Sequence, residues 1–559
     1  MDNYAIADQF SLLSKLLDIH GDNSFKSKTY AAAAFNIEKL PEPLANTPRD
    51  SVSRIRGIGE SVAKKVFELL DTGEMQSLKE FLANTPPGVV EMLQIKGIGP
   101  KKIHTIWKEM GIDSIGELQY ACGENRLTRF KGFGEKTQQN VLESINFYLN
   151  HQGHFLYAQV AEVFPMIDGY LKKIFPEDKV SVTGAFRRQE LTLQELEYVI
   201  AQDKETIKPR MVSANPPELL EENDNSMVYL LKNGLKLRFY HGETALGQTL
   251  METTGPLSFT DAFKKKFAAA FSKTNGQETE IFSAAGIPFI EPCLRHQPDI
   301  LEKAAKKKLP LLIQATDVKG LIHSHSKWSD GANTLEEMAE ELIRRGFEYM
   351  VISDHSKSAF YANGLSEERI REQFRQIDEL NARYKPFRIF KSIECDILND
   401  GSLDYSNEML ATFDLVIASV HSNLSMSEEK AMARILRAVE NPYTTILGHP
   451  TGRLLLSRNG YPVDHSRLID ACAKHQVVIE LNAHPRRLDM DGAFIPEALE
   501  KNVLISIDPD AHALEGFDDI RFGVLAAQRG GLTAAQNLSS FTLNEFETFL
   551  AARRKAKGI

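Results

Sequence analysis

The sequence predicts a multidomain protein with an all-α N-terminal part, a central α+β part and a C-terminal α/β part. Up to about residue 150, apolar side chains recur at helical spacing, as they do between Ile6 and Ile19. Between about residues 155 and 300, short strand-like runs alternate with helical ones. From about residue 318 onward, β-rich runs alternate regularly with amphipathic helices, which favours a parallel sheet, closed as a barrel or open.

The overall composition fits this organisation and leaves the binding partners open. A chain of 559 residues is too long for one hydrophobic core, so we expect domains at 1–85, 86–150, 151–300 and 318–559, with a basic connector at 301–317. No run reaches the roughly 20 apolar residues that a membrane span needs, and the start lacks the features of a signal peptide. The four scattered cysteines fit a reducing cytoplasm. The net charge of −10 argues against a surface coated with basic residues but permits local basic patches.

One short pattern recurs three times in the helical part: a basic residue, Gly-apolar-Gly, and the polar start of a helix. The copies are RIRGIGESVAKKV (54–66), QIKGIGPKKIHTI (94–106) and RFKGFGEKTQQNV (129–141). Two glycines let the backbone approach a phosphate closely and leave N–H groups free at a helix start. A single copy can equally be a tight packing turn between helices. Three copies resemble helix-hairpin-helix motifs, which grip the DNA backbone without reading sequence. The candidate DNA contacts are Gly57, Gly59, Gly97, Gly99, Lys101, Lys102, Gly132 and Gly134.

Histidines and carboxylates gather after the strand-like runs of the C-terminal part. Nine of the 15 histidines lie there, and βα loops at strand ends converge on one face of a barrel. Imidazole and carboxylate together suit zinc, manganese or iron, and so many groups exceed what one ion can use. We therefore expect two or three divalent ions (Mn²⁺, Zn²⁺ or Fe²⁺). The candidate ligands are His323, His325, Asp330, His355, Glu394, His421, His449, Asp510 and His512. We expect structural roles for His465, His475 and His484.

The motifs HSHSKWSDG, SDH, SVH, GHPTGR and DPDAH, with the lone Glu394, resemble the polymerase-and-histidinol-phosphatase (PHP) domain. The resemblance covers about residues 318–559 and implies a distorted (βα)7 barrel with a trinuclear metal site. All nine ligand positions of that family pattern are filled, and Ile322 departs from it where an acidic residue is common. Arg453 in HPTGR is a candidate phosphate clamp, because guanidinium matches phosphate geometry; a plain surface role is the alternative.

The first 35 residues resemble the N-terminal lyase-type domain of family X DNA polymerases. In that family a lysine after the first hairpin can form a Schiff base with an abasic sugar. Lys65 falls on that position, although a lysine there also suits a solvated helix face.

The run TGAFRRQELTLQELEYVI resembles the catalytic motif of a polymerase X-like nucleotidyltransferase palm, in degenerate form. Gly184, Arg187 and Arg188 agree with the family, while Glu195 and Glu197 stand where two aspartates belong. Lys236 takes the position of the third aspartate, and a lysine would repel the ions. We therefore expect Mg²⁺ binding and templated polymerisation to be weak or lost. The alternative is a different register for the third acid, with both glutamates still binding one metal.

The whole chain resembles bacterial family X DNA polymerases fused to a PHP domain. The resemblance implies a cytoplasmic, nucleoid-associated DNA repair protein with a metal-dependent 3′–5′ exonuclease, acting on gapped or 3′-ended DNA. Deoxynucleotides are possible further ligands, and no membrane partner is expected. Three alternatives stay open: an active polymerase with an attached exonuclease, a small-molecule phosphatase of the histidinol-phosphate type, and a non-catalytic DNA-binding scaffold.

Overall fold

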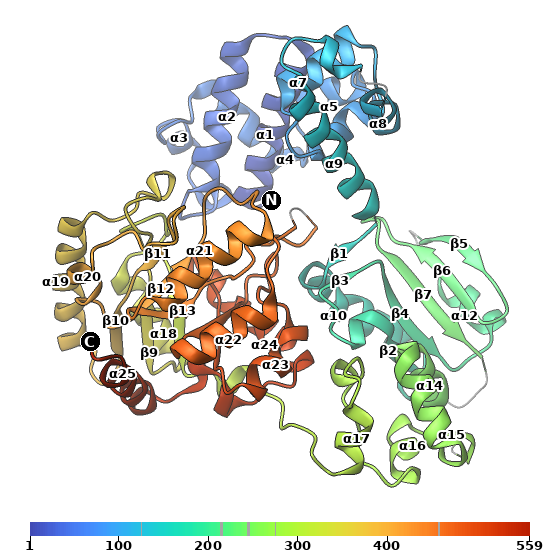
Figure 1. The fold of residues 1–559 in the computed structure, drawn as a ribbon. Coiled ribbons are helices and arrows are strands. Elements are labelled where there is room, and N and C mark those ends of the chain that lie inside the picture. Colours follow the sequence, from blue (N-terminus) through green and yellow to red (C-terminus); the bar gives the residue numbers. More distant parts are fainter. Residues whose placement is uncertain (124–125, 152, 213–215, 243–245, 274–275, 457–458) are drawn as a thin grey trace. The chain divides into compact units, whose positions relative to one another are not determined.

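The computed structural model describes residues 1–559 except 124–125, 152, 213–215, 243–245, 274–275 and 457–458. The chain divides into two compact units, Met1–Gln152 and Gly153–Ile559. Figure 1 shows the first unit as a group of helices and the second as sheets with covering helices. None of the helices in the described part of the chain is both long and apolar enough to cross a bilayer.

Helices of the first unit pack around one hydrophobic core, which residues of both expected helical domains share. Asp2 begins the first helix by accepting a hydrogen bond from the Ala5 N–H, and Gly21 ends it with a φ of 70°. Apolar side chains at helical spacing form the buried face. The α-helices are α1 (Asn3–His20), α2 (Ser24–Glu38), α3 (Arg49–Val52), α4 (Glu60–Thr72), α5 (Gln76–Ala83), α6 (Pro87–Glu91), α7 (Pro100–His104), α8 (Ile115–Gly123) and α9 (Glu135–His151).

The second unit begins with an α+β palm. A five-stranded mixed sheet has the order β2-β4-β7-β6-β5, and β4 and β7 run parallel at its centre. Alternate residues of these strands are buried against α10, as the period of two requires. The elements are β1 (Phe155–Leu156), α10 (Tyr157–Ile174), β2 (Val180–Thr183), α11 (Gly184–Arg187), β3 (Thr192–Leu193), β4 (Glu195–Ile200), α12 (Lys204–Arg210), β5 (Glu218–Glu222), β6 (Ser226–Leu230) and β7 (Lys236–His241).

Short helices follow the palm and pack around their own core, which we call the thumb. Ile300, Leu301 and Ala304 of its last helix are buried in that core. The first part of the expected connector 301–317 is therefore thumb, because its apolar residues recur at helical spacing. The helices are α13 (Leu246–Thr254), α14 (Leu257–Lys266), α15 (Ala268–Lys273), α16 (Glu278–Ala284) and α17 (Ile300–Ala305).

Parallel strands in two sheets, β10-β9-β8 and β11-β12-β13-β14-β15, form the C-terminal domain. A bridge between Ser324 and Ala511 joins β8 to the end of β15, and only Ser392 and Ile393 separate β10 from β11. The strands therefore close into a barrel in which β10 and β11 share one position. Along β9, Tyr349 and Val351 belong to one hydrophobic cluster and Met350 and Ile352 to another, as expected for an inner and an outer face.

Helices cover the outside of this barrel (Figure 1). Helix α18 shows why they form: Thr334 and Glu337 make a capping box, Gly346 ends the helix at a φ of 84°, and one apolar face is buried. Phe546 and Leu550 of helix α25 are buried in the same hydrophobic cluster as Tyr349 and Val351 of β9. The elements are β8 (Gly320–Ser324), α18 (Leu335–Arg345), β9 (Tyr349–Ile352), α19 (Glu367–Arg383), β10 (Arg388–Lys391), β11 (Glu394–Asp396), α20 (Asn407–Leu410), β12 (Val416–Ser419), α21 (Glu428–Glu440), β13 (Thr444–Leu447), α22 (His465–His475), β14 (Val478–Asn482), α23 (Ile495–Glu500), β15 (Ile505–Asp508), α24 (Ile520–Arg529) and α25 (Leu543–Lys557).

Candidate metal centre

The carboxyl ends of the barrel strands bring all nine expected ligands together. Eight of them form three overlapping groups whose ligand atoms lie within 4.8 Å of one another. The ninth, His449, places Nε2 2.9 Å from Glu394 Oε1. The groups are His325, Asp330, His355 and His512; His323, His325 and Asp510; and His355, Glu394 and His421. Three groups that share two histidines suit a cluster of ions better than a single ion.

Glu394, at the start of β11, is the centre of one side of this cluster. Its Oε1 lies 3.0 Å from His421 Nε2 and 3.2 Å from His323 Nε2, and its Oε2 lies 3.0 Å from His355 Nδ1. Burial alone would raise the pKa of this carboxyl, but the surrounding imidazoles, His421 first, hold it well below its usual value. Glu394 therefore presents a carboxylate with two oxygens facing different histidines, as a metal-bridging ligand would.

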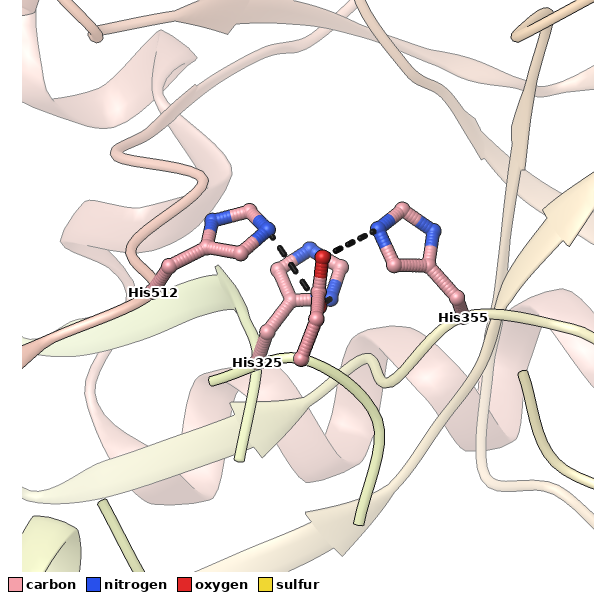
Figure 2. A group of neighbouring side chains, drawn as sticks. His325, His355 and His512 are labelled. Carbon is pink, nitrogen blue, oxygen red and sulfur yellow. Dashed lines mark ion pairs between the residues drawn. The ribbon is translucent and has the colours of Figure 1, made fainter. Parts of the chain in front are cut away.

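The other side of the cluster is formed around His325 and Asp330. Figure 2 shows the rings of His325, His355 and His512 around a common space. Asp330 Oδ1 lies 3.5 Å from His512 Nε2, and its Oδ2 lies 3.7 Å from His355 Nε2. Burial, and then the neighbouring His512 and His355, lower the pKa of His325 to about 3, so its imidazole is neutral. A neutral imidazole is the form that binds metal.

Two features of this cluster fit divalent metal ions. His325 Nδ1 is buried without a hydrogen-bond partner among the described residues. Buried polar atoms of this kind are costly unless a ligand satisfies them. In addition, His323 and Asp510 adopt φ values of 60° and 52°, a region that non-glycine residues rarely occupy. Such strain is typical of functional sites, where the surrounding structure holds it.

Two buried carboxylates that the sequence analysis did not single out support the ligands. Glu480 of β14 hydrogen-bonds Nδ1 of His323 and accepts the His449 N–H at 2.5 Å. Asp354, next to His355, accepts hydrogen bonds from the N–H and hydroxyl groups of Ser326 and Ser329 and from the Gln373 amide. It thereby fixes the loop that carries His325 and Asp330. The only signal in the sequence was an acidic residue within or beside a buried apolar strand.

Arg453 does not point at the cluster. Its guanidinium donates to the carbonyl oxygens of Arg487, at 3.0 Å, and Leu488, and to Asp491 Oδ2 at 2.7 Å. The expected phosphate clamp therefore has all its side-chain nitrogens occupied within the chain. Arg487 lies closer to the centre, because its Nε is 3.6 Å from Oδ2 of Asp510.

The remaining C-terminal histidines lie outside the three groups. His465 stacks on Phe494, with ring centroids 3.6 Å apart. His475 is the last residue of α22. His484 accepts the Arg486 N–H at 3.2 Å within the loop after β14.

The three glycine hairpins have the geometry that their pattern predicts. The first glycine of each copy has a left-handed backbone, with φ of 84° at Gly57, 86° at Gly97 and 93° at Gly132. The second glycine of each copy, Gly59, Gly99 or Gly134, directly precedes α4, α7 or α9 and faces open space. Lys101 is exposed, and Lys102 donates to the Gly97 carbonyl at 3.2 Å. The N–H groups at these helix starts are thus accessible to a phosphate.

Lys65 lies in α4, directly after the first hairpin. Its Nζ donates to the Ser77 hydroxyl at 2.5 Å and lies 5.9 Å from the centroid of the Tyr30 ring. Lys65 as a residue is half-buried. Its lyase role stays a prediction.

The two palm glutamates are occupied by neighbours in the same sheet. Glu195 pairs with Arg238 at 2.7 Å, while Glu197 accepts the Ala185 N–H at 2.9 Å and the Tyr240 hydroxyl at 3.0 Å. A Cβ on Gly184 would collide with the Glu197 carboxylate, so this carboxylate rests on the glycine. Lys236 is exposed opposite Glu195, and Arg238 is the cation that contacts Glu195.

The palm arginines are also engaged. Arg187 donates to Thr254 and Glu278, each at 2.6 Å, and Arg188 donates to Glu190 and to the Thr254 carbonyl. Glu195, Glu197, Arg187 and Arg188 of the expected nucleotide site are therefore all engaged by neighbouring groups of the palm and thumb.

Comparisons with known proteins agree with this division of the chain. Residues 1–75 match the family described as "Helix-hairpin-helix domain", residues 89–146 the "SAM-like Helix-hairpin-helix tandem", and residues 322–484 the "PHP domain". A "Probable phosphatase" of Thermoanaerobacter sp. (strain X514) is 28% identical over 36% of this chain and 80% of its own. The "Probable phosphatase YcdX" of Escherichia coli O81 (strain ED1a) is 26% identical over 41% of this chain and 82% of its own.

One relative spans nearly the whole chain. It is the "DNA polymerase/3'-5' exonuclease PolX" of Bacillus subtilis (strain 168), which is 32% identical over 555 residues, or 96% of each chain. The match includes the helical unit, the palm and thumb, and the barrel with its histidine cluster. The chain therefore belongs to the PolX family.

Proposed function

We propose that this protein is a metal-dependent 3′–5′ exonuclease that acts on DNA through its PHP domain. The observation that carries the proposal is the convergence of nine histidine and carboxylate side chains at one end of the barrel. The glycine hairpins give the same chain a means of holding a DNA backbone. The name of the Bacillus subtilis relative includes this activity.

The nine clustered side chains would hold two or three divalent ions, with His325 and His355 common to two groups each. When bound, the ions supply Lewis acidity and neutralise charge on a phosphate group. The protein fixes the ligands in advance, since Glu480 and Asp354 hold His323 and the Ser326–Ser329 turn. The chemistry of the donors fits Mn²⁺, Zn²⁺ or Fe²⁺.

The palm serves as a scaffold with weak or absent polymerase activity. Templated polymerisation needs carboxylates that are free to bind magnesium. Here Arg238 neutralises Glu195, and hydrogen bonds from the Ala185 N–H and Tyr240 engage Glu197. The substrate we expect is a gapped or 3′-ended DNA, held by its backbone.

The test uses a gapped duplex labelled at the 5′ end of the primer strand, with Mn²⁺ and with or without deoxynucleotides. We expect stepwise shortening of the primer in both reactions. The variant carrying His323→Ala and His325→Ala should lose more than about 100-fold of this activity, because it loses ligands in two of the three groups. Equal shortening by that variant would refute the assignment of the site, and primer extension would show that the palm is active.

A phosphatase acting on small molecules is the second candidate, because relatives named phosphatases match the barrel region. The helical unit argues against it, since a small substrate has no use for three DNA-gripping hairpins. Turnover of a free phosphomonoester that exceeds DNA cleavage under the same conditions would favour the phosphatase.

A further inference from the structure

The loop after β14, residues 483–491, lies beside the candidate ligand Asp510 and is tightly held at both ends. The Asn482 N–H donates to the Asp489 carbonyl at 2.5 Å, and the Ala483 N–H donates to the Asp508 carbonyl at 2.7 Å. The buried Asp489 carboxylate accepts the N–H and hydroxyl of Thr451, each at 3.0 Å. Side chains on this loop are therefore presented from a fixed backbone.

Arg453 strengthens this loop from behind. It donates to the backbone oxygens of Arg487 and Leu488, and its ion pair with Asp491 measures 2.7 Å. Only 18% of its side chain is exposed. Each side-chain nitrogen of Arg453 already faces an acceptor within the chain, so these contacts hold its guanidinium against the loop.

Arg487 differs from Arg453 in its contacts, although its side chain is about as exposed, at 21%. Its side chain makes no hydrogen bond to any residue that the structure describes, and its charge contact is with Asp510. The Nε–Oδ2 distance of 3.6 Å exceeds hydrogen-bonding range. Asp510 faces the ligand group on its other oxygen, Oδ1, which lies 3.1 Å from His325 Nε2. Arg487 therefore lies beside Asp510, a candidate metal ligand, with guanidinium donors that none of the described residues occupies.

We propose that Arg487 binds the phosphate group undergoing hydrolysis, and that Arg453 positions it by holding the carbonyl oxygens of Arg487 and Leu488. This inference rests on the proposed phosphoesterase function. A guanidinium offers a planar pair of N–H donors that matches two phosphate oxygens. Placed at the rim of the metal centre, Arg487 can contact the phosphate oxygens that the metal ions leave free. Arg487 is thus a catalytic residue, and Arg453 is a positioning residue.

The first test measures kcat and KM for a single-stranded oligonucleotide with Mn²⁺, together with inhibition by inorganic phosphate and metal content by mass spectrometry. Arg487→Ala should lower kcat/KM by about 100-fold and raise the phosphate inhibition constant about tenfold, with metal content unchanged. Arg487→Lys should recover part of the loss, because it restores charge but not the paired donors. Arg486→Ala is the matched control: it removes the same charge from an exposed neighbour and should change these values less than about twofold.

The second test separates positioning from binding. If Arg453 acts through Arg487, the variant Arg453→Ala raises the phosphate inhibition constant, and the double variant with Arg487→Ala is no worse than Arg487→Ala alone. Additive losses would overturn the role of Arg453. Equal behaviour of Arg487→Ala and Arg486→Ala, or loss of metal from Arg487→Ala, would overturn the role of Arg487. Should the wild type not cleave DNA, the proposed function fails, and direct calorimetry of inorganic phosphate binding still tests Arg487.

Discussion

Glu480 contacts two candidate metal ligands at once without being one itself. Its carboxylate bonds Nδ1 of His323 and accepts the backbone N–H of His449. A carboxylate on one imidazole nitrogen fixes the tautomer, so that the other nitrogen presents its lone pair. The other nitrogen of His323, Nε2, faces Glu394 and Asp510. Glu480 therefore determines both the orientation and the protonation of a central ligand.

Replacing this carboxylate should weaken metal binding. We expect Glu480→Gln to lower Mn²⁺ affinity about 10- to 100-fold, because an amide holds the imidazole less firmly and donates as readily as it accepts. Titration of metal-free protein followed by calorimetry measures this directly. Glu429→Gln, an exposed glutamate on α21, is the control and should bind Mn²⁺ as the wild type does. An unchanged affinity in Glu480→Gln would show that Glu480 is only a packing residue.

The difference between Glu480 and the nine ligands shows what a sequence can predict about a site. The ligands stand in local motifs at strand ends, so residue type and spacing indicated them. Glu480 acts on His323 from 157 positions away, and no local pattern contains that contact. Arg453 follows a ligand motif closely, yet its guanidinium turns to a loop 34 residues later. Motifs indicate which residues meet, whereas the direction of a long side chain depends on packing.

At the level of elements, a buried charge network fastens the thumb to the palm. Glu278 at the start of α16 pairs with Arg187 of α11 and with Arg295, each at 2.6 Å. The Arg295 side chain is 0% exposed and lies within 5.5 Å of the ring centroids of Phe259, Phe282 and Phe289. The alternation of strands and helices predicted these elements, but not this contact. It joins positions 91 residues apart, and Arg187 of the Arg187-Arg188 pair takes part in it.

Removing the charge of Glu278 should destabilise the thumb in a pH-dependent way. Burial raises the pKa of this carboxyl, but Arg295 and Arg187 outweigh burial and hold it below the ordinary 4.5. A lowered pKa gives stability that is present above the unfolded pKa and is lost as pH falls through the folded one. Glu278→Gln should therefore cost about 3 to 5 kcal/mol at pH 7, since it leaves Arg295 buried and unpaired.

Scanning calorimetry at pH 7 and at pH 3.5 measures this cost. The difference between wild type and Glu278→Gln should shrink at the lower pH, where the wild-type carboxyl begins to protonate. Glu302→Gln on α17 is the control, because its pair with Lys306 is exposed and 3.8 Å long. Equal melting of wild type and Glu278→Gln at pH 7 would contradict the network.

At the level of the whole molecule, the candidate DNA-binding hairpins and the candidate metal centre lie in different units. The three glycine hairpins lie in Met1–Gln152, which has its own hydrophobic core, and the metal centre lies in Gly153–Ile559. Under the proposed function, hairpin contacts to phosphates would supply affinity that depends on salt, whereas the barrel would supply hydrolysis. Substrate affinity and turnover should therefore respond to different parts of the chain.

A fragment that begins at Gly153 should keep turnover and lose affinity. With Mn²⁺ present, we expect its kcat on a gapped duplex to stay within about threefold of the full chain, because the metal centre and its supports are complete. Its KM should rise at least about tenfold, and the salt dependence of KM should become shallower, since each lost phosphate contact removes a slope of about 0.9. In the full chain, Lys101→Glu with Lys102→Glu should shift KM in the same direction without altering kcat. An unchanged KM in both proteins would mean that Gly153–Ile559 holds the DNA without the hairpins, because both changes remove hairpin contacts and leave that unit intact.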